Sequence, residues 1–238
     1  MHVTAIVLAA GRGSRFNPKV SKPLFRIGSK PILVYSLLTL SRHPYVKDII
    51  VVANSLNKKK IIEKIKECRI NKIKDVVLGG LRRQDSVRRG LEVMDKHTDY
   101  VLIHDSARPF IDKNIISSVI NAAKKYGAAI SGVPLKVTVK QAQRVRKQKL
   151  AIAAFVKKTL DRKDLWEIQT PQVFKTALII KAYKKFGSLS VTDDASLVEK
   201  LKKKVGIVPG SYFNIKITTT EDLAVASEII KNGVHLRL

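Results

Sequence analysis

The chain has 238 residues, of which 45% are hydrophobic and 27% are charged, a balance typical of a globular protein rather than a disordered or fibrous one. No apolar run approaches the roughly 18 residues needed to cross a bilayer, so we expect no membrane-spanning segment. The single cysteine, Cys68, excludes an intramolecular disulfide and is typical of a reducing compartment, so the cytoplasm is the expected location.

The charge balance is strongly basic, with 46 Lys and Arg residues against 19 Asp and Glu residues and a formal net charge of +27. Such a charge suits nucleic acid, an anionic membrane or small polyanionic substrates. The lysines, however, are spread over stretches with apolar residues at helical spacing, and the aromatic residues, 6% of the chain, do not interleave with them. We therefore interpret most of the charge as solvated surface and favour an anionic substrate over nucleic acid.

Short β-branched runs alternate with amphipathic stretches over the first half of the chain. Strands buried on both faces and joined by crossover helices indicate an α/β fold with a mostly parallel sheet, in which ligands bind beyond the carboxyl ends of the strands. The predicted strands are 3–8, 48–53, 73–78, 100–104 and 128–133, and the predicted helices are 31–42, 57–68, 84–95 and 113–126.

The alternation ends after Pro134, where two stretches of alternating character flank a polar centre at residues 144–149. This pattern predicts a protruding β-hairpin arm over about residues 136–162. Because an isolated hairpin is marginal in water, we expect the arm to pack on a second copy of the chain in a homodimer. From residue 166 onward we expect two helices, a strand near 205–208 and a closing helix over about 220–231, all within a single domain of residues 1–238.

The stretch LAAGRGSRFNPKVSKP, residues 8–23, directly follows the first predicted strand. It is not a dinucleotide fingerprint, which needs glycine where Phe16 stands, and it lacks the G-x-x-x-x-G-K of a Walker A loop. Its glycines nevertheless let backbone N–H groups approach phosphate oxygens, and its arginines and lysines supply charge on either side. The loop therefore predicts a triphosphate site, with a glycine turn among solvated basic residues as the alternative.

This first loop resembles the signature loop of nucleotidyltransferases that activate sugar and polyol phosphates. Further blocks occur in the order found in the 2-C-methyl-D-erythritol 4-phosphate cytidylyltransferase family and cover nearly the whole chain. They are GGLRRQDSV (79–87), HDSARPF (104–110), TLDRKDLWEIQTPQVF (159–174), VTDDAS (191–196) and NIKIT (214–218). The resemblance implies a Rossmann-like sheet of the nucleotide-diphospho-sugar transferase type, flanked by helices.

The resemblance implies a cytidine pocket formed by Gly80 and Ser86 together with Ala10. Backbone groups and a hydroxyl can pair with the amine, ring nitrogen and carbonyl of cytosine. The alternative for Ser86 is a local hydrogen bond at the start of a helix. The family often has an acidic residue where this chain has Leu81. The nucleotide-binding residues implied by the resemblance are Ala9, Ala10, Gly11, Gly13, Gly80, Ser86 and Asp105.

Asp105 follows the apolar run YVLIH, which places a carboxylate at the carboxyl end of a central strand, close to Arg108 in sequence. An aspartate there can orient Mg²⁺ or another divalent cation, or accept substrate hydroxyls, and the arginine can bind a phosphate. A simple ion pair between the two is the alternative. We expect the metal to be held mainly by the phosphates of CTP, with Asp105 as a candidate ligand, and we expect His104 to be a packed strand residue.

Hydroxyls and cations suited to a phosphorylated polyol are scattered along the rest of the chain. The resemblance places them around the polyol phosphate or the nucleotide phosphates, with Arg162 reaching the site of the neighbouring subunit; the alternative for each is a solvated surface or strand position. Asp193 and Asp194 are interpreted as the N-cap and first-turn acid of a helix from about Ala195 rather than as metal ligands. The substrate-binding residues so implied are Asp105, Arg108, Thr138, Arg162, Thr170, Thr192 and Lys216.

The resemblance implies cytidylyl transfer from CTP to 2-C-methyl-D-erythritol 4-phosphate with release of pyrophosphate. A phosphate monoester is already a competent nucleophile, so alignment and charge neutralisation suffice, and Arg15, Lys22 and Lys216 are the expected catalytic residues. A ribitol 5-phosphate cytidylyltransferase on the same fold is the nearest alternative. A basic nucleic-acid-binding protein that has kept the fold is a more remote one.

Overall fold

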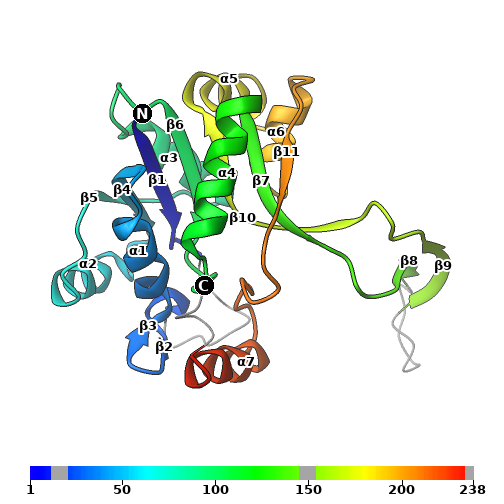
Figure 1. Cartoon of the computed structure of the whole chain (residues 1–238), viewed down its shortest axis with the longest axis horizontal. Coiled ribbons are helices and arrows are strands. Elements are labelled where there is room, and N and C mark those ends of the chain that lie inside the picture. The colour runs from blue at the N-terminus through cyan, green and yellow to red at the C-terminus, as the bar shows by residue number, and fades with distance from the viewer. Residues whose placement is uncertain (12–20, 145–153, 234–238) are drawn as a thin grey trace.

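A computed structural model describes residues 1–11, 21–144 and 154–233 (Figure 1). A seven-stranded sheet forms its centre, in the order β11-β7-β10-β6-β1-β4-β5. All its strands run parallel except β10, which is antiparallel to both of its neighbours. The strands are β1 (Val3–Leu8), β4 (Val46–Ala53), β5 (Ile73–Leu78), β6 (Tyr100–Asp105), β7 (Ala128–Pro134), β10 (Trp166–Lys175) and β11 (Gly206–Pro209).

Helices cover both faces of this sheet because successive side chains of each strand point to opposite sides. Val7 of β1 packs in one core cluster with α1, α2 and α4, whereas Ile6 packs in another with α3, α5 and α6. A third, smaller cluster joins α7 to β2. The helices are α1 (Ile32–Arg42), α2 (Lys58–Glu67), α3 (Arg83–Glu92), α4 (Lys113–Tyr126), α5 (Thr176–Phe186), α6 (Ala195–Lys200) and α7 (Thr220–Lys231), with the short η1 (Lys22–Leu24), β2 (Arg26–Ile27) and β3 (Lys30–Pro31) before α1.

The predicted α/β architecture with a mostly parallel sheet is confirmed, and the predicted helices and strands are found within a few residues of their expected bounds. One central strand was not predicted. β10 contains the polar run Gln169–Thr170–Pro171–Gln172, which interrupts its apolar pattern, and its pairing with β7 shifts register between Ile168 and Gln172. This irregularity lies beside the carboxyl end of β6, where a bulge can re-aim a side chain toward a ligand.

The predicted arm is a two-stranded antiparallel hairpin of β8 (Val139–Arg144) and β9 (Ala154–Leu160), which projects from the body (Figure 1). Among the described residues, its strands pair only with each other. Val137, Phe155 and Val156 expose more than half of their surface. The arm therefore presents apolar side chains that the described part of its own chain does not cover.

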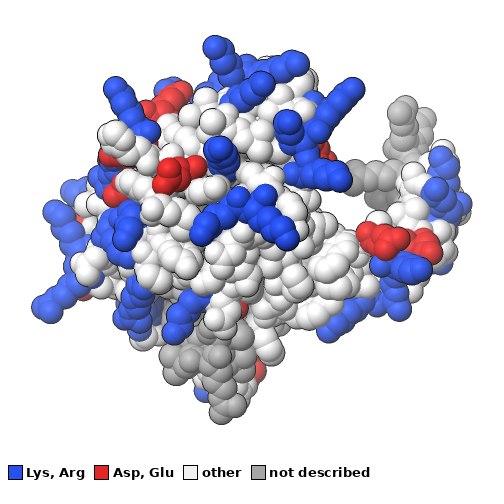
Figure 2. All heavy atoms as spheres, turned by 45° about the horizontal axis from the view of Figure 1, so that its top comes forward, with Lys and Arg blue, Asp and Glu red and all other residues white. Residues whose placement is uncertain are grey.

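Lys and Arg side chains are spread over the visible face of the molecule, with few Asp or Glu side chains between them (Figure 2). This distribution agrees with the interpretation of most of the charge as solvated surface. Within the ranges given above, no helix combines the length and the apolar character needed to cross a bilayer.

Candidate active site

The loop after β1 and the end of β6 lie side by side because the two strands are parallel and in register, with Leu8 opposite Asp105. The backbone N–H of Ser106 donates to the carbonyl of Leu8, which ties the two strand ends together. The carboxyl edge of the sheet, where chemistry was expected, therefore brings the start of the glycine loop next to Asp105.

Two asparagines that the sequence prediction did not include hold this glycine loop. Asn54 Nδ2 donates to the carbonyl of Ala10 over 3.1 Å, and Asn57 Nδ2 donates to the carbonyl of Ala9 over 2.9 Å. The same Asn57 nitrogen lies 2.8 Å from Oγ of Ser21, the residue before Lys22. Both ends of the loop are thus attached to one buried amide; Gly13 and Arg15 lie outside the described residues.

The predicted base-binding residues meet where β5 ends. The backbone N–H of Gly80 donates to Ser86 Oγ over 3.2 Å, and a Cβ on Gly79 would lie 2.5 Å from that oxygen and 2.7 Å from Cβ of Ala10. Only glycine lets Ser86 and Ala10 lie this close to the backbone at position 79, because Cβ atoms in real proteins do not make contacts of that length. Ser86 also donates to the carbonyl of Arg82 over 3.4 Å, so the local hydrogen bond weighed as its alternative is present. Leu81 is almost fully exposed.

Asp105 carries the densest set of ionic contacts at this edge. Lys216 Nζ lies 2.6 Å from Oδ2, and Nε of Arg83, the first residue of α3, lies 3.3 Å from Oδ1. Burial alone would raise the pKa of Asp105, but the charges of Arg83 and Lys216 outweigh it and hold the pKa well below its usual range. The carboxylate therefore stays ionised. The sequence analysis did not include Arg83 among the site residues. Its position at the start of a helix that follows two glycines is the feature from which it could have been predicted.

Arg108 does not form the ion pair that was the alternative for it. Its guanidinium is buried and donates to the backbone carbonyls of Asn214 and Ile168, over 2.7 and 3.4 Å, and its Nε has no hydrogen-bond partner in the described part of the chain. Burial lowers the pKa of Arg108, although Asp105 and Glu167 favour its charge. A buried guanidinium with an unused donor is suited to an anion that enters from solvent.

Thr170 and His104 lie behind Asp105. Thr170 Oγ1 accepts from the backbone N–H of Asp105 over 3.1 Å and lies 3.1 Å from His104 Nδ1. The other ring nitrogen of His104 lies 3.0 Å from the carbonyl of Arg108. Burial lowers the pKa of His104 to about 4, so the ring is neutral near pH 7. As expected, His104 is a packed strand residue.

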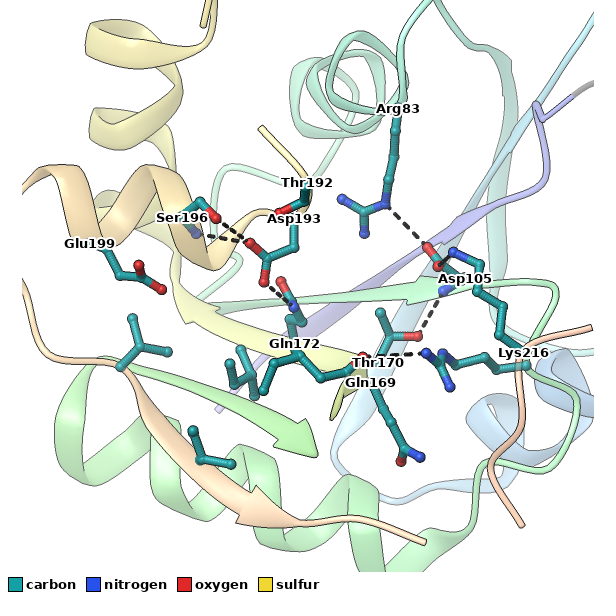
Figure 3. Close-up of a pocket in the computed structure, with 15 residues that line it drawn as sticks. Arg83, Asp105, Gln169, Thr170, Gln172, Thr192, Asp193, Ser196, Glu199 and Lys216 are labelled. Atoms are coloured by element: carbon teal, nitrogen blue, oxygen red, sulfur yellow. Dashed lines mark hydrogen bonds and ion pairs between the residues drawn. The ribbon is translucent and has the colours of Figure 1, made fainter. Parts of the chain in front are cut away.

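A cavity of about 470 Å³ opens beside these residues (Figure 3). It brings together five of the predicted substrate-binding residues, which come from β6, β10, the loop after β6, the loop before α6 and the segment after β11. Ala10, Gly80 and Ser86 are not part of its described lining and lie along the edge over β1, β4 and β5. The predicted residues that line the cavity are Asp105, Arg108, Thr170, Thr192 and Lys216.

Thr138 and Arg162 belong to the arm and do not line the cavity of their own chain, as far as the chain is described. Arg162 instead donates to the carbonyl of Lys136 at the base of the arm. Asp193 stands one residue before the cap position of α6 rather than at it, but its Oδ1 accepts from the backbone N–H of Ser196 over 3.1 Å and so satisfies a donor of the first turn. The expectation for Asp194 is wrong: it is the residue at the cap position, but its carboxylate makes no cap bond and pairs with Arg83.

The fit of a divalent cation depends on Asp105. The described ranges hold no cluster of three or more His, Cys, Asp or Glu side chains that could form a metal cage. Asp105 nevertheless supplies a hard oxygen donor facing the cavity, and magnesium is often bound by one or two carboxylates together with substrate phosphates. The residues present therefore fit an ion that is bound mainly by a nucleotide.

A mostly parallel sheet with a glycine-rich sequence after its first strand and a cation-lined cavity at its carboxyl edge is typical of the nucleotidyltransferase class. Residues 3–232 match the model of the 2-C-methyl-D-erythritol 4-phosphate cytidylyltransferase family. Curated relatives with that name from Shouchella clausii and Caldanaerobacter subterraneus are each 43% identical to this chain; the matches cover 97% of it and 97% and 100% of those proteins, respectively.

Solved structures agree with this assignment. The crystal structure of 4-diphosphocytidyl-2C-methyl-D-erythritol synthase from Anaerococcus prevotii matches with a TM-score of 0.81 and 32% identity, over 96% of each chain. The 2-C-methyl-D-erythritol 4-phosphate cytidylyltransferase of Thermus thermophilus matches with a TM-score of 0.77 and 27% identity, over 97% of this chain and 100% of that one. The chain belongs to the 2-C-methyl-D-erythritol 4-phosphate cytidylyltransferase family, and it is an enzyme of the cytidylyltransferase type.

Proposed function

We propose that this enzyme transfers a cytidylyl group from CTP to 2-C-methyl-D-erythritol 4-phosphate and releases pyrophosphate, as a step of the non-mevalonate route to isoprenoid precursors. Its membership of the family supports the reaction. The observation that carries the proposal is the contact of 2.6 Å between Lys216 and Asp105, which lies at the cavity and next to the end of β1.

CTP binds along the edge over β1, β4 and β5. The backbone of the glycine loop, from Ala9 to Gly13, receives the triphosphate, and Arg15 and Lys22 neutralise it. Ala10, Gly80 and Ser86 select the base. The attachment of Ala9, Ala10 and Ser21 to two asparagines supports this role, because flanking residues that are already fixed lose less entropy when the nucleotide binds.

The polyol phosphate binds in the cavity beside Asp105. Arg108 offers an unused donor to its phosphate, and Thr170, Thr192 and Lys216 line the same space. Thr138 and Arg162 reach this site from the arm of a second copy, so the active unit is a homodimer of single-domain chains. The exposed apolar residues of the arm support the pairing.

An oxygen of the acceptor phosphate attacks the α-phosphorus of CTP in line. The bond from that oxygen to phosphorus forms as the bond from phosphorus to the bridging oxygen breaks, and pyrophosphate leaves with the electron pair. Arg15, Lys22 and Lys216 stabilise the charge that develops, and no protein base is needed because the attacking oxygen carries no proton. Mg²⁺, held by the CTP phosphates with Asp105 as the protein ligand, would neutralise part of the triphosphate charge.

The proposal is tested by measuring pyrophosphate release with CTP and Mg²⁺ across a panel of polyol phosphates, repeated with UTP, ATP and GTP. We expect turnover with CTP and 2-C-methyl-D-erythritol 4-phosphate and much slower turnover with every other pair. Preference for ribitol 5-phosphate would identify the alternative acceptor on the same fold. No turnover with any pair, together with tight and salt-dependent RNA or DNA binding, would contradict the proposal.

Mixed dimers test the role of the arm. One chain carries Arg162→Ala and the other carries Lys22→Ala, so that a dimer contains one site with both native residues only if the arm crosses between subunits. We expect partial recovery of activity in the mixture, relative to either variant alone. No recovery would mean that each site is built within one chain.

A further inference from the structure

A chain of ionic contacts runs from the cavity into the interior of the protein through Arg83. Its Nε faces Asp105 Oδ1 at 3.3 Å, and its Nη1 lies 2.6 Å from Oδ2 of Asp194 (Figure 3 shows the first of these contacts). The two carboxylates belong to β6 and to the residue before α6, so one guanidinium joins parts of the chain that are distant in sequence. The charges of Asp194 and Asp105 raise the pKa of Arg83, although its burial works against them.

Asp194 is not one of the residues that line the cavity. It is buried, and its second oxygen, Oδ1, accepts a hydrogen bond from the hydroxyl of Tyr183 on α5. Burial raises the pKa of Asp194, against the effect of the Arg83 charge. Burying a carboxylate is costly unless it is paired, so this acid needs a specific partner, and that partner is Arg83.

Lys216 differs from Arg83 in its freedom to move. The Lys216 side chain is 42% exposed, whereas that of Asp105 is 12% exposed and that of Arg83 is held between two carboxylates. In the proposed reaction Lys216 neutralises phosphate oxygens, and to do so its ammonium must shift at least part of its contact away from Asp105. A buried carboxylate that lost its only cation would be destabilised.

We propose that Arg83, held by Asp194 and Tyr183, is a positioning residue for cytidylyl transfer that fixes Asp105 while Lys216 turns to the phosphates. The inference rests on the proposed function. The planar guanidinium can donate to one carboxylate through Nε and to the other through Nη1 in a fixed geometry, which the single ammonium of a lysine cannot reproduce. Because Asp194 is next to Asp193 and Thr192 in the chain, the same contact locates the wall of the cavity that carries Thr192.

The experiment compares Arg83→Lys, Arg83→Gln, Asp194→Asn and Tyr183→Phe with the wild-type enzyme. For each, kcat and the KM values for CTP and for the polyol phosphate are measured, and folding is checked by thermal unfolding. We expect Arg83→Lys and Asp194→Asn to lower kcat by about tenfold to hundredfold, with the KM for CTP changed by less than about threefold. Tyr183→Phe removes one hydrogen bond and should lower kcat by about twofold to tenfold.

A double-mutant cycle gives a readout that a merely structural role would not produce. If Asp194 acts through Arg83, Asp194→Asn has no further effect on kcat once Arg83 is replaced by Gln, so the double variant matches Arg83→Gln alone. Additive losses would overturn the proposal. Equal kcat in the wild type and in folded Arg83→Lys would also overturn it. If Asp194→Asn does not fold, Tyr183→Phe and Arg83→Lys still decide the outcome.

Arg89→Gln is the matched control. Arg89 lies on the same helix, its side chain is exposed, and its Nη1 pairs with Glu92 of that helix over 3.2 Å. We expect this variant to leave kcat unchanged. All comparisons are made with a wild-type enzyme that releases pyrophosphate from CTP and the polyol phosphate; absence of that activity would count against the proposed function, whereas unchanged variants would count against the role of Arg83.

Discussion

The cavity beside Asp105 and the arm of β8 and β9 hold their polar residues in different ways. At the cavity, Asp105, Thr170 and Arg108 are buried, and each is fixed by hydrogen bonds or ion pairs to residues that are distant in sequence. On the arm, Arg162 is exposed and its described hydrogen bond is to the backbone of the arm base. These three cavity side chains are therefore fixed by contacts within their own chain.

This difference has a consequence for function. Side chains that are fixed before the substrate arrives lose little entropy on binding, which favours alignment and charge stabilisation. The arm gains comparable order only if a second copy covers Val137, Phe155 and Val156, which expose 62–65% of their surface. We therefore expect substitutions in the body to act on each chain separately, and substitutions in the arm to act through association.

Phe174→Ala tests the stability of the body, which is the central sheet with the helices that cover it. Phe174 is fully buried on β10, the strand that also carries Thr170, and truncation of such a side chain should lower the free energy of unfolding by about 3–5 kcal/mol. Urea unfolding followed by circular dichroism measures this. Lys157→Ala, at an exposed position on β9, is the control and should stay within about 0.5 kcal/mol of wild type. Similar losses in both variants would remove the distinction between body and arm.

Lys216→Ala tests whether the exposed cation of the cavity serves the reaction. Loss of a charge contact made to the developing pyrophosphate should lower kcat by about 10² to 10³, equivalent to about 2.7–4 kcal/mol. Steady-state pyrophosphate release measures the effect. Lys231→Ala is the control, because Lys231 lies on α7 and pairs only with Glu228 of its own helix among the described residues. A Lys216→Ala enzyme that keeps near-normal kcat would exclude a catalytic role for this lysine.

The pH dependence of stability gives a second test of the body. His104 is buried and neutral, with a pKa of about 4, whereas an unfolded histidine has a pKa of about 6.5. Above about pH 6.5 His104 is neutral in both states, and the protein keeps its full free energy of unfolding. As the pH falls from about 6.5 to about 4, this free energy decreases, because only the unfolded state binds a proton in this window. The total loss is about 3 kcal/mol.

Replacing the imidazole removes this dependence. We expect a His104→Gln variant to lose less stability between pH 7 and pH 4 than the wild type does, and an exposed control, His97→Gln, to follow the wild type. Urea midpoints measured at several pH values give the comparison. Parallel pH curves for wild type and His104→Gln would show that His104 does not contribute in this way.

A pair of substitutions in the arm should have the smallest effect on a single chain and act on association instead. Phe155→Ser and Val156→Ser each remove an apolar side chain that a partner would bury, so each should raise the dimer dissociation constant by about tenfold or more. Analytical ultracentrifugation measures the constant, and activity at low protein concentration should fall with it. Lys157→Ser on the same strand is the control. A variant that stays dimeric would show that these side chains lie outside the contact between copies.

The predicted elements of the first half of the chain were found because strands and crossover helices there have clean apolar periods. β10 was not found, because Gln169, Thr170 and Gln172 occupy positions that an apolar strand would fill. Those polar residues are used at the site: Thr170 contacts Asp105, and Gln172 Nε2 donates to Asp193 over 2.8 Å. The polar residues that break the strand pattern are therefore the ones that contact the site.

Arg83, Asn54 and Asn57 show the corresponding limit for the site. Each is a polar residue at the beginning of a helix or in the loop before it, where the sequence indicates capping or a solvated position. Their roles depend on contacts with Asp105, Ala10 and Ala9, which are between 22 and 48 residues away. Contacts between residues so far apart in sequence leave no periodic pattern from which they could be predicted.

The sequence by itself determined the fold class, the position of the glycine loop, the arm and the family, because these depend on local periodicity and on ordered blocks of residues. Only the tertiary structure decided which cation pairs with which carboxylate. Asp105 had Arg108 as its near neighbour in sequence, yet its partners are Arg83 and Lys216. Ion pairs are selected by distance in the folded sheet and by burial, and both are properties of the packed chain rather than of neighbouring residues.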